Sequence, residues 1–209
     1  MRTVAILPVK SFGRAKQRLT GGFSNRPELA AAMVADVLAA LAQVPELDEV
    51  IVVTAQAGAT GEGVIVVHDP VEAGQSAAAL RGIEAALERG AERVLLVPGD
   101  CPTLDPHEVS ALLTQRAGVV IVPDRHGQGT NALLLTPPDV MEPSFGDGSF
   151  ARHAARARAA GAGLKVADVR SLGLDVDTPD DLAALRRALA AWPGGAARTR
   201  ALLEEAAVA

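Results

Sequence analysis

The feature of this sequence that most constrains its fold is the alternation of short aliphatic runs with longer helical patterns. The aliphatic runs are rich in β-branched residues and predict strands at 3–9, 49–54, 64–68, 93–97, 119–122, 132–135 and 164–169. The helical patterns cover 27–43, 76–89, 106–115, 150–160 and 179–191. Strands this apolar, separated by helices, predict an α/β fold: a mostly parallel sheet that is flanked by helices on both faces.

The chain is organised as a single domain. A length of 209 residues suits one well-buried core, and we see neither a linker-like segment nor an internal repeat of fixed period. We therefore assign residues 1–192 to one domain. After Trp192 the sequence Pro-Gly-Gly breaks the last helical pattern, and residues 193–209 are either a C-terminal tail or a short helix.

Composition excludes several functional classes. Aromatic residues make up only 2% of the chain and the net charge is −5, so neither stacking platforms nor an overall basic surface is present for nucleic acid. No apolar run approaches the ~20 residues of a membrane span. A single cysteine, Cys101, rules out an intramolecular disulfide and a multi-thiolate zinc cluster. We expect a cytoplasmic protein.

The first predicted strand is followed by a cluster of cations. In open α/β sheets, ligands bind beyond the carboxyl ends of the strands, so ligand sites are expected in the loops that follow strands. The cluster contains Lys10, Arg14, Lys16 and Arg18. In an otherwise acidic chain these cations predict a local phosphate site, with a solvated basic loop as the alternative.

Two acidic segments are candidates for a divalent cation. Asp100 follows a Pro-Gly turn at the end of the fourth strand, while Asp105, before Pro106, is the better helix cap. This leaves Asp100 available to ligate Mg²⁺. Asp175 and Asp177 lie two residues apart and point the same way if the segment is extended.

The start of the next helix explains the carboxylates that follow. Thr178 is predicted as its N-cap and Pro179 as its first residue. Asp180 and Asp181 are then assigned to the helix dipole.

Three loops carry further candidate ligand contacts. Thr130 and Asn131 end a glycine-bearing loop and can donate hydrogen bonds to an anion. Gly146 and Ser149 lie at a predicted helix start, where their amides form an anion site and Ser149 can also cap the helix. Gln75, in the loop before another helix, can read a nucleobase. Ordinary turn and cap chemistry is the alternative for all three loops.

Other nucleotide and metal signatures are absent from the sequence. It contains no Gly-x-x-x-x-Gly-Lys-Ser/Thr phosphate loop. Cys101 is expected to be a small buried thiol. The histidines lack metal-ligand spacing, and His107 is expected on a helix surface; they are His68, His107, His126 and His153.

Taken together and in this order, the loops resemble those of the 2-phospho-L-lactate or phosphoenolpyruvate guanylyltransferase family of coenzyme F-420 biosynthesis. That family belongs to the glycosyltransferase-A-like, or nucleotide-diphospho-sugar transferase, superfamily. The resemblance spans residues 3 to about 191 and rests on segments 7–19, 98–102, 123–133, 145–150 and 174–182. The loop at 72–78 lacks the Gly-Leu-Asn sequence associated with relatives. The resemblance therefore does not identify the residues that contact guanine.

The resemblance implies a reaction in which GMP passes from GTP to the phosphate of a small phospho-acid, with release of pyrophosphate. It implies that the acid is bound by Thr130, Gly146 and Ser149, and that Mg²⁺ is held by Asp100, Asp175 and Asp177.

With this reaction, the basic cluster and the loop before the second helix supply the predicted nucleotide-binding residues, which are Lys10, Arg14, Lys16, Arg18 and Gln75. Lys16 and Asp100 are predicted to act at the reacting phosphates. The alternatives are a nucleotidyltransferase of the same fold with another acceptor, such as a molybdopterin or a sugar phosphate, and a non-catalytic nucleotide-binding protein. Assembly as a homodimer is left open.

Overall fold

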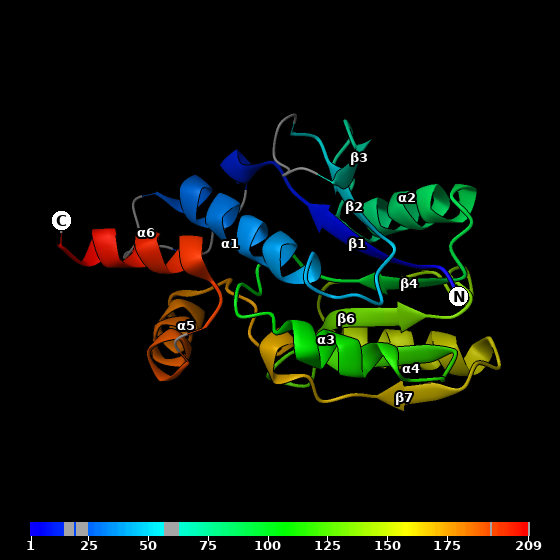
Figure 1. The fold of residues 1–209 in the computed structure, drawn as a ribbon. Helices are drawn as coiled ribbons and strands as arrows, with labels where there is room; N and C mark the ends of the chain where they lie inside the picture. Colours follow the sequence, from blue (N-terminus) through cyan, green and yellow to red (C-terminus); the bar gives the residue numbers. More distant parts are fainter. Residues whose placement is uncertain (15–18, 20–24, 57–62, 193, 209) are drawn as a thin grey trace.

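The computed structural model describes residues 1–14, 19, 25–56, 63–192 and 194–208, and it has the α/β architecture expected from the alternating pattern (Figure 1). The strands are β1(Thr3–Val9), β2(Glu49–Thr54), β3(Val64–His68), β4(Arg93–Leu96), β5(Val119–Pro123), β6(Thr130–Leu135) and β7(Leu164–Val166). The helices are α1(Arg26–Leu41), α2(Gln75–Glu88), α3(Pro106–Leu113), α4(Ser149–Ala159), α5(Pro179–Ala191) and α6(Ala197–Val208). Two short 3₁₀ helices are η1(Phe12–Arg14) and η2(Arg170–Leu172).

Every predicted strand and helix is present, and the differences lie at the ends. The last strand stops at Val166, whereas a strand to residue 169 was expected; residues 167–169 have no regular structure and lead into η2. α3 ends at Leu113, two residues before the predicted end.

The strands form one seven-stranded sheet in the order β3-β2-β1-β4-β6-β5-β7. β1 is parallel to β2 and β4, β2 is parallel to β3, and β5 is parallel to β7. β6 is antiparallel to both of its neighbours, β4 and β5. The start of β6 therefore lies at the same edge of the sheet as the ends of β1 and β4.

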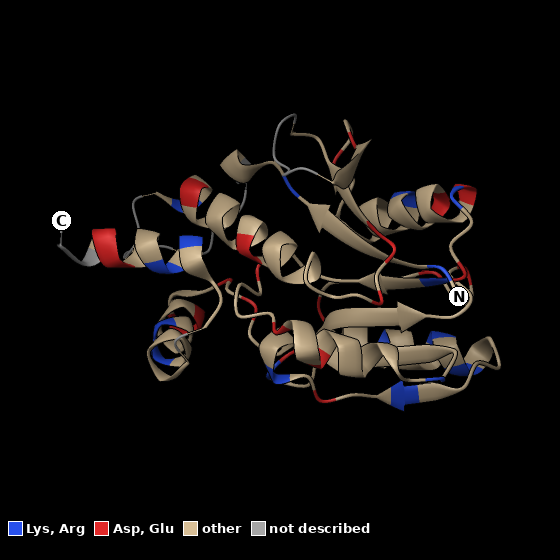
Figure 2. Cartoon of the chain, viewed as in Figure 1, with Lys and Arg blue, Asp and Glu red and all other residues tan. Residues whose placement is uncertain are grey.

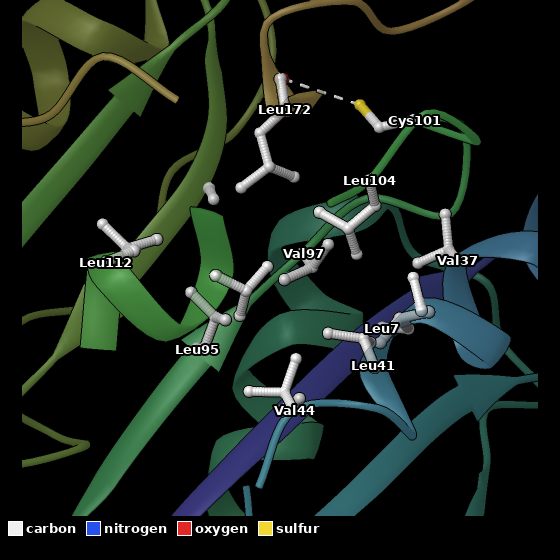
Figure 3. Close-up of a cluster of buried hydrophobic side chains, with 14 of the residues drawn as sticks. Leu7, Val37, Leu41, Val44, Leu95, Val97, Cys101, Leu104, Leu112 and Leu172 are labelled. Atoms are coloured by element: carbon white, nitrogen blue, oxygen red, sulfur yellow. Dashed lines mark hydrogen bonds between the residues drawn. The ribbon is translucent and has the colours of Figure 1, made fainter. Parts of the chain in front are cut away.

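Two hydrophobic layers cover the sheet. α1 and α3 pack on one face, and α2 and α4 pack on the other. Figure 3 shows the first layer, in which Leu7 and Leu95 of the strands meet Leu41 of α1 and Leu112 of α3. The largest fully buried side chains are all Ile, Leu or Met, so the core is aliphatic, as the scarcity of aromatic residues requires.

Charged residues lie mainly on the helices and loops, and the strands of the sheet carry few of them (Figure 2). Within the described ranges, no helix combines the length and the apolar character that a membrane crossing needs.

The segment after Trp192 folds back as α6 and packs alongside α1 (Figure 1). The buried carboxylate of Asp36 in α1 accepts hydrogen bonds from the backbone N–H groups of Arg198 (3.0 Å) and Thr199 (2.8 Å) in the first turn of α6. These bonds satisfy helix N–H groups that otherwise lack partners. Of the two alternatives for the segment after Trp192, the described residues form a helix over Ala197–Val208.

Candidate active site

A cleft of about 830 Å³ is lined by the loops that follow β1, β3 and β4 together with part of α1. Its volume falls in the range of small-ligand pockets. Of the predicted site residues, those that line the cleft are Lys10, Gln75, Asp100, Gly146 and Asp177. Thr130, Ser149 and Asp175 are not among its lining residues.

Asp100 is positioned by the close packing of its loop against α1. A Cβ atom on Gly99 would lie 2.9 Å from Cγ2 of Val34, so the turn approaches the helix as closely as glycine allows. Asp105 caps α3 by accepting a hydrogen bond from the His107 N–H (2.8 Å), as predicted. Since the cap is Asp105, the carboxylate of Asp100 is not used for that purpose.

The carbonyl oxygen of Leu172 ties three segments together behind the cleft. It accepts hydrogen bonds from Nδ2 of Asn131 (2.6 Å) and from Sγ of Cys101 (3.6 Å), the second of which is drawn in Figure 3. The loop after β4, the start of β6 and the acidic segment are thereby held in one place. Cys101 is fully buried, which agrees with the expected role of a small core thiol.

The acidic segment contacts the Asp100 loop directly, because the Val176 N–H donates to the carbonyl oxygen of Asp100 (3.3 Å). Nδ2 of Asn131 also donates to Oδ1 of Asp175 (3.2 Å). Burial raises the pKa of Asp175, and the negative charges of Asp100 and, more weakly, Asp177 raise it further. The three predicted metal carboxylates therefore lie within electrostatic reach of one another.

These carboxylates fit a hard cation that is completed by its substrate. Among the described residues, no three His, Cys, Asp or Glu side chains form a full metal-binding set. Mg²⁺, however, is usually held by one or two carboxylates together with water and substrate phosphates. Oxygen donors with concentrated negative charge suit that arrangement.

The start of α5 agrees with its sequence prediction. Thr178 is the N-cap and forms a capping box with Asp181, whose Oδ2 accepts from the Thr178 N–H (2.8 Å). Asp181 also forms an ion pair with Arg125. The carboxylate of Asp181 is therefore used to stabilise the start of α5.

The loop after β1 is held by two acceptor side chains that sequence patterns did not single out. Ser11 donates its N–H to Oε1 of Glu72 (2.7 Å) and its hydroxyl to Oε2 (3.1 Å), and the Phe12 N–H donates to Oε1 of Gln56 (2.9 Å). Glu72 has a φ of 46°, in the left-handed region that a side chain of this kind rarely adopts. Strain of this kind concentrates at ligand sites, so Glu72 belongs with the nucleotide candidates.

The structure describes only some of the predicted phosphate-binding cations. Lys10 lines the cleft, and the backbone of Arg14 ends η1. Lys16 and Arg18 lie outside the described residues. Gln75 is the first residue of α2, one residue earlier than the predicted helix start.

An extra residue in β6 decides which way Thr130 and Asn131 point. Val122 pairs with Ala132, whereas Pro123 pairs with Thr130, so Asn131 has no opposite residue in β5. Such a bulge shifts the alternation of side chains by one position. Asn131 consequently faces the acidic segment, and Thr130 faces α4 on the other side of the sheet.

His153 of α4 is fully buried next to the start of β6. Its Nδ1 lies 2.9 Å from Oγ1 of Thr130, and its Nε2 accepts a hydrogen bond from the Ser144 N–H (2.7 Å). Burial, followed by the positive charges of two arginines in α4, lowers the pKa of His153 to about 4. The ring is therefore uncharged at neutral pH. The sequence offers only one histidine on a short helix, which is why its role was missed.

The helix start at Ser149 corrects one expectation. Gly148 is the N-cap of α4 and Ser149 is its first residue, so Ser149 does not cap the helix. The Ser149 N–H donates to the carbonyl of Gly146 (3.0 Å) and the Phe150 N–H donates to that of Gln128 (3.1 Å). Protein carbonyls therefore accept from these two first-turn amides in this structure, and an anion site at the Ser149 amide would have to displace the bond to Gly146. The hydroxyl of Ser149 and the turn at Gly146 remain candidates for ligand contact.

Comparison with known proteins agrees with this geometry. Residues 3–187 match the family model described as "Guanylyl transferase CofC like". The chain is 52% identical to a phosphoenolpyruvate guanylyltransferase of Conexibacter woesei, over 98% of this chain and 96% of that protein. It is 37% identical to a 2-phospho-L-lactate guanylyltransferase of Methanothermobacter thermautotrophicus, over 87% and 83% of the two chains.

A solved structure shares the fold. A crystal structure from Desulfovibrio desulfuricans G20, named for a nucleotide-diphospho-sugar transferase, superposes with a TM-score of 0.78 at 20% identity. The superposition covers 98% of this chain and 95% of that one. At that identity the likeness shows the fold alone, whereas the family match covers almost the whole chain. The chain therefore belongs to the CofC-like guanylyl transferase family.

Proposed function

We propose that this protein transfers the GMP group of GTP to the phosphate of phosphoenolpyruvate, or of 2-phospho-L-lactate, in coenzyme F-420 biosynthesis. An oxygen of the acid's phosphate attacks the α-phosphorus of GTP. The bond between that phosphorus and the oxygen bridging to the β-phosphate breaks, and pyrophosphate leaves. Relatives at 52% and 37% identity carry the names of these two activities, which supports both acceptors as candidates.

The observation that carries the proposal is the meeting of Asp100 with the Asp175 segment beside the cleft. Transfer of this kind asks a protein mainly for positioning and for charge stabilisation of phosphates. Mg²⁺ held by Asp100, Asp175 and Asp177 would neutralise phosphate charge as the reaction proceeds. We assign Asp100 and Lys16 to the reacting phosphates.

We assign the nucleotide to the loops after β1 and β3. Lys10 lines the cleft, and with Arg14, Lys16 and Arg18 it supplies the positive charge that a triphosphate requires. Gln75 lines the same cleft at the start of α2. Replacing Lys16 or Arg18 by Ala should raise the KM for GTP and leave the melting temperature unchanged, because Lys and Arg side chains seldom contribute to a protein core.

We assign the acid to Thr130, Gly146 and Ser149. Gly146 lines the cleft, whereas Thr130 and Ser149 are not among its lining residues and have exposures of 8% and 1%. Buried hydroxyl groups provide directional hydrogen bonds, which discriminate between small anions by the positions of their acceptor oxygens. The cytoplasm remains our expectation for where this reaction occurs.

The test is pyrophosphate release from GTP with purified protein and Mg²⁺. Each acid is supplied in turn: phosphoenolpyruvate, 2-phospho-L-lactate and 3-phosphoglycerate. A sugar phosphate and a molybdopterin serve as alternative acceptors. We expect release with one or more phospho-acids only, and its loss on chelation of the metal. Release only with a sugar phosphate or a molybdopterin would move the protein to another acceptor class, and binding of GTP without any release would make it a nucleotide-binding protein.

A further inference from the structure

The buried ring of His153 joins the two parts of the proposed acid site. One ring nitrogen contacts Thr130 at the start of β6, and the other holds Ser144, which leads into the turn that contains Gly146. Phe145 packs edge-on against the ring, with centroids 5.2 Å apart and the planes at 73°. Among the described residues, no other side chain hydrogen-bonds both to the start of β6 and to the turn that contains Gly146.

The direction of each hydrogen bond follows from its partner. A backbone N–H can only donate, so Nε2 of His153 must be the unprotonated nitrogen. The single hydrogen of the neutral ring then lies on Nδ1 and is donated to Oγ1 of Thr130. Because the ring offers Thr130 no acceptor, the hydroxyl hydrogen of Thr130 must be directed to another group. Thr130 is therefore held as a hydrogen-bond donor.

A donor in this position selects ligands by chemistry. The oxygens of a carboxylate or a phosphate are acceptors only, and they match a hydroxyl whose hydrogen is turned outward. A ligand that presents only a donor would find one lone pair left on that oxygen and would leave the outward hydrogen of the hydroxyl without an acceptor. The bulge at Asn131 is what brings Thr130 to the α4 face, within reach of this ring.

The turn itself is held by a neighbouring residue of α4. Arg152 donates to the carbonyl oxygens of Ser144 and Phe145, each at 3.1 Å, and to that of Asp147. The backbone around Gly146 is therefore supported by consecutive residues of α4, Arg152 from the outside and His153 from the core.

We propose that His153 is a positioning residue for the acid substrate: it turns the Thr130 hydroxyl into a fixed donor and anchors the turn that carries Gly146. This inference rests on the proposed function for the identity of the ligand. It does not require His153 to touch the substrate or to exchange a proton.

Two amide variants separate the two bonds of the ring. The side-chain amide of Asn reaches about as far as Nδ1, and that of Gln reaches about as far as Nε2. His153→Asn can keep the donor to Thr130, and His153→Gln can keep the acceptor for Ser144. We expect His153→Gln to raise the KM for the acid about tenfold, which corresponds to one hydrogen bond, with the KM for GTP unchanged. His153→Asn should recover a large part of that loss.

A double-mutant cycle tests whether His153 acts through Thr130. Thr130→Val removes the hydroxyl, and Thr130→Ser is the matched control that retains it. If His153 acts through the hydroxyl, adding His153→Gln to Thr130→Val should not raise the KM for the acid further, whereas adding it to Thr130→Ser should. Additive effects, or equal rises in the KM for acid and for GTP, would reduce His153 to a structural residue.

The ring geometry has a readout that does not depend on catalysis. In protein labelled with ¹⁵N-histidine, at neutral pH, the His153 resonance, identified by its loss in His153→Gln, should report hydrogen on Nδ1 and none on Nε2. A ring protonated on Nε2 would overturn the inference even in an active enzyme. If the wild type releases no pyrophosphate with any phospho-acid while the Nδ1–H form is observed, the proposed function fails and the donor geometry of Thr130 stands.

Discussion

The two walls of the candidate site are built in different ways. The nucleotide wall, formed by Lys10, Ser11, Glu72 and Gln75, follows the parallel strands β1 and β3, and its side chains are exposed or half-buried. The acid wall is Gly146 at the cleft together with residues around the start of the antiparallel strand β6 that do not line the cleft, namely Thr130, Ser149 and His153. All but Gly146 are buried.

The difference matches the ligands proposed for each wall. A triphosphate is large and highly charged, so cations near solvent and a backbone loop fixed by Glu72 can hold it. A small phospho-acid offers few atoms, so discrimination needs buried groups with fixed hydrogen-bond directions. Variants on one wall should therefore change the KM of one substrate only, whereas the carboxylates between the walls should affect the reaction of both.

The largest effect is expected from Asp100→Asn, between the two walls. Loss of a carboxylate ligand for a cation that neutralises phosphate charge should lower kcat at least ~100-fold, with little change in Tm. Asp105→Ala is the matched control, because it removes the cap of α3 and should cost ~1 kcal/mol of stability while turnover is kept. The measurements are pyrophosphate release and thermal melting. Normal turnover in Asp100→Asn would remove the metal assignment.

Asp175→Asn should also lower kcat, by ~10-fold to 100-fold, yet make the metal-free protein more stable. The folded-state pKa of Asp175 is raised above its ordinary value of 3.8, mainly by burial and then by Asp100. The folded state therefore binds this proton more tightly than the unfolded state does, and wild-type stability falls as pH rises from 3.8 through the raised pKa.

In Asp175→Asn the side chain stays neutral, so the stability that wild type loses on ionisation of Asp175 is kept. The amide oxygen can still accept the hydrogen bond from Nδ2 of Asn131. We expect a gain of ~0.5–2 kcal/mol at neutral pH, measured by denaturant unfolding with chelator present. The exposed Asp168→Asn is the control. A lower stability of Asp175→Asn than of wild type at neutral pH would contradict the assignment of burial and like charge as the cost.

Ser149→Ala should act on the acid wall alone. Since Gly148 is the N-cap of α4, removal of the Ser149 hydroxyl should leave Tm nearly unchanged. Loss of one hydrogen bond to a charged ligand, ~1.5–3 kcal/mol, corresponds to a roughly tenfold to hundredfold weaker apparent affinity for the acid. Initial rates with each substrate varied in turn provide the check. An equal effect on GTP would mean that the two walls are not independent.

Glu72→Gln should give a smaller effect, confined to the nucleotide wall. The amide keeps the length of the side chain and one acceptor oxygen, but loses the charge that strengthens both bonds from Ser11. We expect the KM for GTP to rise about threefold to tenfold, with the KM for the acid unchanged. Glu84→Gln, on the exposed side of α2, is the control and should be neutral.

The smallest effect on activity is expected from Asp36→Ala, which lies on neither wall. The variant removes the acceptor of two backbone N–H groups at the start of α6 and should cost ~1–3 kcal/mol of stability. Both KM values should stay within about twofold at a temperature where the protein is folded. A selective change in the KM for GTP would show that the docking of α6 reaches the nucleotide wall through α1.

Much of the fold was predictable from local patterns. Aliphatic runs and helical periodicity carry their own signal, so β1, β2, β3 and α5 have the residues that the sequence predicts at both ends. Caps are equally local: Asp105 and Thr178 are caps because the residues that they bond lie within the next turn. The acidic residues at 100, 175 and 177 were singled out for the same reason, as each lies beside a turn or a helix start, and their metal role stays a prediction.

What the tertiary structure decided depends on pairing between distant segments. The antiparallel direction of β6 and its extra residue at Asn131 set which face Thr130 occupies, and no local pattern around residue 130 contains that information. His153 and Glu72 act through partners 23 and 61 residues away, so their roles exist only once the sheet has formed. The sequence alone thus determined the elements and the acidic and basic groups at their ends. The tertiary fold decided which of these groups meet, because hydrogen-bond geometry between segments depends on strand order and register rather than on neighbouring residues.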